Sequence, residues 1–113
     1  MKRPVINLFD IETSLAEMYS FSLYPEFIPI SNIKNDWFII CASWMDLGSD
    51  KVHSVKISRK CNDKEVVKEL SKMISTSDFL IAHNGDRFDL RKLNARLIYH
   101  NLPPVSPITT IDT

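Results

Sequence analysis

The sequence predicts an α/β domain in which a mixed five-stranded sheet is flanked by helices. Within 113 residues, apolar runs of strand length are interspersed with two segments of helical periodicity. Three expected strands precede the first helix, which favours antiparallel pairing at the start. Each later strand is reached through a helix, which favours parallel additions. No repeat or low-complexity tract divides the chain, so residues 1–113 are expected to form one domain.

The first strand is expected within Val5–Thr13, a short apolar run that carries two acidic residues. Residues 14–36 follow without clear periodicity, and this length suggests a functional lid or connector rather than a plain loop. The segment is rich in aromatic residues that could stack on nucleic-acid bases or close over the core, and the sequence leaves both open. These residues are Tyr19, Phe21, Tyr24 and Phe27.

Two further strands are expected before the first helix. The continuous apolar run Trp37–Trp44 is typical of a strand buried on both faces. Lys51–Ser58 alternates instead, which predicts a half-exposed edge strand paired with its predecessor. His53 in that strand is interpreted as an edge residue at the surface and not as a ligand.

The clearest helix is expected over Asn62–Ser75, where Asn62 can cap the start and Glu65 completes a capping-box-like pattern. Its apolar positions recur at helical spacing and predict a core face. They are Val66, Val67, Leu70, Met73 and Ile74.

A buried strand, Phe79–Ala82, leads into the Asn84–Gly85 break and a second helix over Asp86–His100. The apolar stripe of this helix comprises Leu90, Leu93 and Leu97. On another face, Lys92 and Arg96 could contact phosphates or be ordinary surface cations, and the pattern does not decide between the two. Ile108–Thr113 is expected to form the last strand.

Three carboxylates are the candidate functional groups of this chain. Asp10 and Glu12 alternate with apolar residues in the first strand, so both project from the same side of the sheet. Two such carboxylates repel each other, and either a divalent cation lies between them or they are simply solvated at a strand end. If Phe79–Ala82 is a parallel neighbour of the first strand, Asp89 faces both carboxylates at the carboxyl edge of the sheet.

The stretches Phe9-Asp10-Ile11-Glu12-Thr13 and Asn84-Gly85-Asp86-Arg87-Phe88-Asp89 resemble the first two motifs of the DnaQ-like (DEDD) 3′–5′ exonucleases. These enzymes belong to the ribonuclease H-like superfamily. Residues 37–44 and 51–55 are similar to exonuclease-like domains common in bacteriophage genomes. The resemblance covers nearly the whole chain. It implies a ribonuclease H-like sheet with the strand order 3-2-1-4-5.

The resemblance also implies a function. It suggests a 3′–5′ exonuclease domain that hydrolyses phosphodiester bonds at single-stranded or frayed ends, DNA more than RNA, by a two-metal mechanism with Mg²⁺ or Mn²⁺. Asp10, Glu12 and Asp89 would be the catalytic metal ligands. The residues expected to contact substrate are Thr13, Asn84, Phe88, Lys92 and Arg96. His83 and His100 receive no catalytic role, and His83 is expected to support the turn.

Relatives in this family continue past the last strand with a third motif, which this sequence does not contain before Thr113. The domain is therefore expected to be truncated at its C-terminus, with an apolar sheet face near residues 5–9 left uncovered and little activity by itself. Such a face could bind a complementing polypeptide or a second copy. The alternative function is a catalytically inactive ribonuclease H-like module that binds a polymerase or another chain. A stand-alone nuclease and the amino-terminal piece of a family-B-like polymerase share the two motifs present.

Composition adds few constraints. The formal net charge is zero, so no global basic field attracts nucleic acid, although bound metal ions would supply positive charge locally. The two cysteines, Cys41 and Cys61, fit neither a zinc pattern nor a disulfide framework, which favours a reducing compartment. Without a signal peptide or an apolar run of membrane length, the chain is expected to be soluble and cytoplasmic, in the host cell if phage-encoded.

Overall fold

A five-stranded mixed sheet forms the centre of the computed structural model, which describes residues 3–25, 27–58, 62–84 and 88–113. Its strands are β1 (Ile6–Thr13), β4 (Ile39–Asp46), β5 (Val52–Lys56), β6 (Phe79–Ala82) and β7 (Thr109–Asp112). They lie in the order β5-β4-β1-β6-β7. Counted along the chain within this sheet alone, the order is the predicted 3-2-1-4-5. The β4–β1 and β4–β5 pairs are antiparallel, whereas β6 runs parallel to both β1 and β7.

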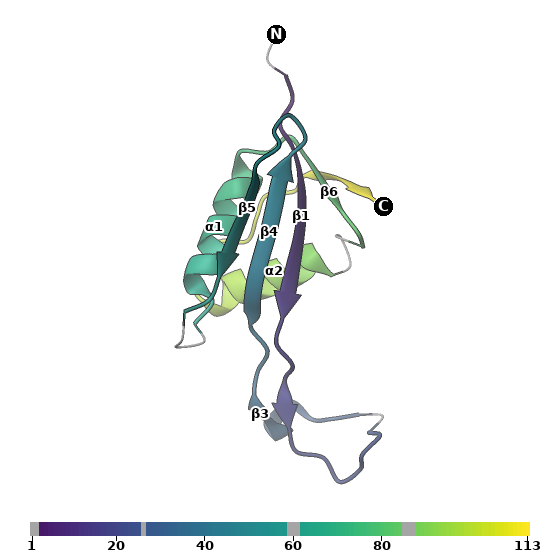
Figure 1. Ribbon diagram of the computed structural model, residues 1–113. Coiled ribbons are helices and arrows are strands. Elements are labelled where there is room, and N and C mark those ends of the chain that lie inside the picture. Colours follow the sequence, from purple (N-terminus) through teal and green to yellow (C-terminus); the bar gives the residue numbers. More distant parts are fainter. Residues whose placement is uncertain (1–2, 26, 59–61, 85–87) are drawn as a thin grey trace.

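The alternation of β1 separates the two faces of the sheet. Phe9 and Ile11 are buried on one face, while Leu8, Asp10 and Glu12 are exposed on the other. Both helices lie on the side of the buried residues (Figure 1). We call the opposite side the open face, because no helix in the described parts of the chain covers it. The predicted uncovered sheet surface near the start of the chain is therefore present.

Helix α1 (Lys64–Ser75) packs its whole predicted core face against the sheet. The five buried residues of α1 are those expected: Val66, Val67, Leu70, Met73 and Ile74. The helix begins later than predicted, since Asp63 occupies the N-cap position. Asn62 still caps the first turn, because its Oδ1 accepts a hydrogen bond of 3.0 Å from the N–H of Lys64.

Helix α2 (Asp89–Tyr99) buries Leu93 and Leu97 of its predicted stripe and ends in a Schellman motif. Asn101 adopts the left-handed conformation, with φ of 60°. Its N–H donates to Ile98 O at 3.0 Å, and the N–H of Leu102 donates to Leu97 O at 2.8 Å. The predicted start of this helix at Asp86 involves residues 85–87, which lie outside the described residues, as does Cys61.

The prediction that the apolar run Trp37–Trp44 is buried on both faces is wrong. In β4, Ile39 and Ala42 are buried, whereas Ile40 and Ser43 are exposed. Ala42 pairs with Ile11 and Ser43 with Asp10, so β4 follows the two-faced pattern of its neighbour β1. The predicted edge strand is confirmed as β5, where His53 is exposed and stacks on the ring of Trp44.

Residues 14–25 and 27–38 form an arm that projects beyond the carboxyl end of β1 (Figure 1). The sequence did not predict its regular structure, an antiparallel pair of β2 (Glu17–Met18) with β3 (Ile33–Asn35) preceded by a 3₁₀ turn over Ile30–Asn32. The arm helps to make the molecule elongated, with extents of 59, 29 and 25 Å. Four of its aromatic residues, Tyr19, Phe21, Tyr24 and Phe27, are exposed, so they do not close over the core.

Candidate carboxylate site

The parallel pairing of β1 with β6 brings the two sequence motifs to the same edge of the sheet. Leu8 pairs with Ile81, so both strands reach this edge together, and α2 begins directly beyond β6. A hollow of about 730 Å³ lies there on the open face. Its lining includes six of the predicted site residues: Asp10, Glu12, Thr13, Asn84, Phe88 and Asp89.

Asp89 is the buried member of the three carboxylates. Its side chain is only 1% exposed, and Oδ2 has no hydrogen-bond partner among the described residues. Burial, together with the negative charges of Asp10 and Glu12, raises the pKa of Asp89 to about 7, against a smaller opposing effect of His83. A buried carboxylate oxygen without a partner is costly. Asp89 is therefore suited to bind a proton or a cation that neutralises it.

The donor chemistry fits a hard divalent cation, because three carboxylates around one hollow offer the oxygen ligands that Mg²⁺ and Mn²⁺ prefer. The described residues do not form a complete metal site in this structure. Among the described residues, no group of three acidic, histidine or cysteine side chains is positioned to enclose an ion as it stands. Asp10 and Glu12 are exposed, whereas Asp89 is buried.

The strand end that carries the second motif is held by β7. The Nδ1–H of His83 donates to the carbonyl of Thr113 at 2.9 Å, and the N–H of Asn84 donates to Asp112 Oδ1 at 2.6 Å. Asn84 has a φ of 57°, a left-handed conformation that asparagine tolerates better than most residues. The expectation that His83 supports the turn is confirmed by its bond to Thr113.

Lys92 lies on α2 beside this hollow rather than in its lining. Its Nζ is 4.1 Å from the ring centroid of Trp37 and 5.8 Å from that of Phe88, which lines the hollow. The two rings hold the ammonium by cation–π attraction. No carboxylate pairs with this ammonium among the ion pairs of the described residues.

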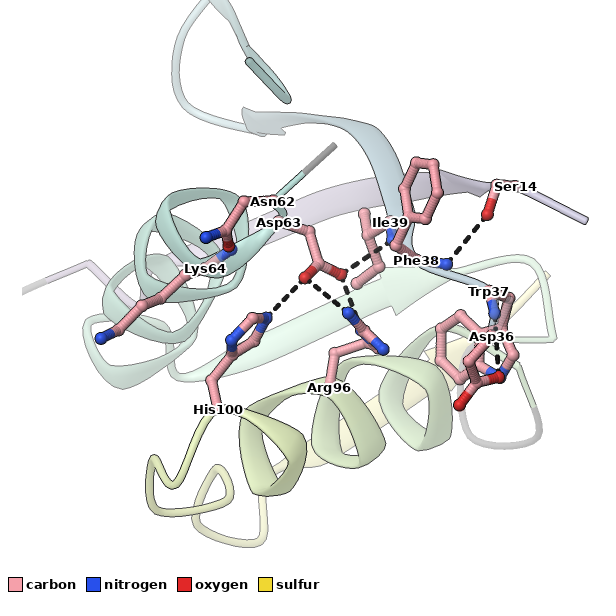
Figure 2. Close-up of polar contacts among 10 residues, drawn as sticks. All are labelled: Ser14, Asp36, Trp37, Phe38, Ile39, Asn62, Asp63, Lys64, Arg96 and His100. Atoms are coloured by element: carbon pink, nitrogen blue, oxygen red, sulfur yellow. Dashed lines mark hydrogen bonds and ion pairs between the residues drawn. The ribbon is translucent and has the colours of Figure 1, made fainter. Parts of the chain in front are cut away.

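Arg96 requires a correction, because it is neither at a phosphate-binding surface nor an ordinary surface cation. It is 6% exposed and donates two hydrogen bonds to Asp63, from Nε to Oδ2 at 2.8 Å and from Nη2 to Oδ1 at 3.0 Å. Figure 2 shows Asp63 surrounded by Arg96, His100 and the backbone of Ile39. The N–H of Ile39 donates to Oδ2 at 2.9 Å, and His100 Nε2 donates to Oδ1 at 2.6 Å. Arg96 is therefore committed to an internal ion pair.

Sequence reasoning missed Asp63 and the placement of Trp37. An Asp beside a helix start suggests an N-cap, but its carboxylate does not cap α1 and instead bonds to β4 and α2. Trp37 was assigned to a buried strand, whereas it precedes β4 and packs on Lys92. The available signal for Asp63 was weak, namely an acidic residue at a helix N-terminus, where the helix dipole favours negative charge.

Comparison with known proteins supports the fold. No protein-family model matches the sequence, and no curated protein matches it. The structure is similar to part of the family B DNA polymerase from the hyperthermophilic archaeon Pyrobaculum calidifontis, with a TM-score of 0.64 and 13% sequence identity. The match covers 90% of this chain and 12% of the polymerase chain. At this identity the likeness establishes the α/β fold and not the activity.

In the described parts of the chain, none of the helices combines the length and the apolar character that crossing a membrane requires.

Proposed function

We propose that this chain is a metal-dependent 3′–5′ exonuclease domain that acts on nucleic-acid ends, with DNA as the expected substrate. The observation that carries the proposal is the meeting of Asp10, Glu12 and Asp89 around one hollow, with Asp89 buried and its Oδ2 unpartnered. The resemblance of the two motifs to DnaQ-like exonucleases and the fold shared with part of a DNA polymerase support it.

In this proposal the three carboxylates hold one or two Mg²⁺ or Mn²⁺ ions. Bound ions of this kind activate water as a nucleophile and stabilise the charge that develops on the leaving oxygen. Asp89 would give up its proton to hold such an ion, because its pKa of about 7 reflects burial first and then repulsion by Asp10 and Glu12, and a cation offsets both. Asp10 and Glu12 would supply their carboxylates from β1.

The remaining residues of the hollow suit a nucleotide. Phe88, 38% exposed, offers a ring face on which a base can stack. Thr13 and Asn84 supply polar groups at the same edge. Lys92, held against Trp37, carries no carboxylate partner among the ion pairs of the described residues, and it suits a phosphate.

Two parallel measurements test the proposal. Isothermal titration calorimetry with Mn²⁺ measures binding, and gel analysis of a 5′-labelled single-stranded oligonucleotide measures digestion with Mg²⁺ or Mn²⁺. We expect Mn²⁺ binding and, in keeping with the little activity expected from the sequence, only slow metal-dependent shortening from the 3′ end, both lost in Asp10→Asn. Asp50→Asn is the matched control, because Asp50 is an exposed carboxylate in a turn outside the hollow. Digestion that persists in Asp10→Asn would refute the assignment.

A second candidate function is a ribonuclease H-like binding module without catalysis. The observation that favours it is that no three side chains among the described residues are positioned to enclose an ion. A folded chain that neither binds Mn²⁺ in calorimetry nor digests the oligonucleotide would select this function over the first.

A further inference from the structure

We infer that the arm is a self-association surface through which two copies of this chain form a symmetric dimer. The inference is independent of the exonuclease proposal. It rests on apolar exposure, the shape of the arm, its charge and the area that it offers.

Exposure is the first observation. Eight large apolar side chains of the arm are exposed: Leu15, Met18, Tyr19, Phe21, Leu23, Tyr24, Phe27 and Ile30. Phe21, Leu23 and Tyr24 at its tip are 109%, 91% and 89% exposed. Single apolar residues scattered over a protein surface are normal, but eight large ones gathered on one arm indicate an interaction site. The arm projects clear of the sheet and helices, so neither of these covers it (Figure 1).

The tip offers both a hollow and side chains that could enter one. A hollow of about 270 Å³ lies within the arm and is lined by residues that include Tyr19, Phe21 and Phe27. Leu23 and Tyr24 belong to the same loop but do not line it. In a two-fold pair, each arm can therefore place Leu23 or Tyr24 into the hollow of its partner, since an isologous contact is made twice.

Charge favours a second copy over nucleic acid. Between Tyr19 and Ile30 the sequence carries one charged residue, Glu26, and Glu17 outside this stretch is paired with Lys34 at 3.9 Å. Apart from that one carboxylate on each copy, two such tips meet with uncharged side chains. Binding of a single strand by aromatic stacking normally includes basic side chains that contact the phosphates, and the tip has none. Zero net charge on the chain also weakens long-range repulsion between copies.

The available area matches what a stable dimer needs. A specific interface buries about 800 Å² on each partner. Large aromatic side chains bury about 150–250 Å² each. Four exposed aromatic and four exposed aliphatic side chains on one arm are therefore enough to supply such an interface.

Sedimentation equilibrium over a wide range of protein concentration tests the inference. We expect a reversible monomer–dimer equilibrium for the unmodified chain. The triple variant Phe21→Ser/Leu23→Ser/Tyr24→Ser should raise the dimer dissociation constant by about 100-fold or more, because central aromatic and aliphatic contacts dominate such interfaces. Since these side chains are almost fully exposed, circular dichroism should show an unchanged fold.

The control variant is Leu8→Ser, which removes an exposed apolar side chain from the open face instead. It should leave the dimer intact. A monomer at every concentration would overturn the inference, and so would a dimer that dissociates in Leu8→Ser but not in the triple variant. A monomer whose affinity for a single-stranded oligonucleotide falls in the triple variant would also overturn it, in favour of base stacking by the arm.

Disulfide cross-linking between copies locates the interface. The two variants compared are Ser22→Cys, at the tip, and Ser49→Cys, in the β4–β5 turn. Mild oxidation should form a disulfide-linked dimer faster in Ser22→Cys. Equal rates in the two variants would contradict an interface at the tip.

Discussion

Arg96 and Asp63 form a buried, doubly hydrogen-bonded ion pair that joins α2 to the start of α1 (Figure 2). Burial alone would raise the pKa of Asp63, but hydrogen bonds from Arg96, Ile39 and His100 outweigh it and hold the pKa below its usual value. The guanidinium of Arg96 is also 4.1 Å from the ring centroid of Tyr99. The pair therefore fixes the helix that carries Asp89.

Replacing Arg96 with Met should strongly destabilise the chain. The change leaves the fully buried Asp63 carboxylate without its cation, a situation that costs about 3–5 kcal/mol. Urea denaturation of the variant measures this loss. Arg91→Met on the exposed side of the same helix is the matched control and should change the free energy of unfolding by about 0.5 kcal/mol or less.

A double variant shows whether the loss comes from the orphaned charge. Asp63→Asn/Arg96→Met removes both charges while the asparagine oxygen can still accept the hydrogen bond from Ile39. Its destabilisation should be smaller than the sum of the two single variants. Simple additivity would show that the two side chains act independently, against the geometry of the pair.

Asp89 should make stability fall as pH rises toward neutrality when chelator keeps the chain free of metal. In an unfolded chain the pKa of Asp is about 3.9, whereas Asp89 in the folded chain has a pKa of about 7. Between these values the folded state binds more protons than the unfolded state, so the free energy of unfolding falls with pH. Below this window both states are protonated, and above it the penalty is constant.

The measurement is the free energy of unfolding of Asp89→Asn minus that of the unmodified chain, at several pH values. This difference should grow from pH 4 to pH 7 by at most about 4 kcal/mol in favour of the variant, since one pKa unit corresponds to about 1.4 kcal/mol. Other titrating groups, including Asp63, cancel to first order in this difference. A difference that does not vary with pH would show that Asp89 titrates normally.

Lys92→Gln should weaken oligonucleotide binding without unfolding the chain. Removing one phosphate contact lowers the dependence of log K on log salt by about 1. Fluorescence anisotropy at several salt concentrations measures this slope. Lys68→Gln is the control, because Lys68 is exposed on α1 and its bridge to Glu65 is a surface pair. An unchanged slope in Lys92→Gln would remove this residue from the proposed binding surface.

The features predictable from sequence are those with strong local periodicity. The core face of α1 and the two-faced β1 follow directly from the spacing of apolar residues. The parallel β1–β6 pairing was left conditional by the residues themselves and was implied by the resemblance, whose strand order 3-2-1-4-5 places the fourth strand beside the first. Arg96 was misjudged because its spacing from Asp89 says nothing about Asp63, which lies 33 positions away in sequence. The strands β2 and β3 of the arm were not predicted, because strands of two and three residues carry no detectable periodicity.

Divalent metal should stabilise the chain in a way that depends on Asp89. The negative charges of Asp10 and Glu12 act on Asp89, so the metal-free folded state contains repulsion that a cation removes. A ligand that binds only the folded state adds about 2.7 kcal/mol when its concentration is 100 times its dissociation constant. Differential scanning fluorimetry with and without Mn²⁺ should therefore show a higher melting temperature with the ion.

The Asp89→Asn variant separates metal binding from general salt effects. Without metal at neutral or higher pH it should melt above the unmodified chain, because the buried charge and its repulsion are gone. With Mn²⁺ it should gain much less, because one oxygen ligand has lost its charge. Asp50→Asn should respond to Mn²⁺ as the unmodified chain does. If saturating Mn²⁺ leaves the melting temperature of the unmodified chain unchanged, the three carboxylates do not share a metal site. The proposed metal-dependent exonuclease mechanism would then be refuted.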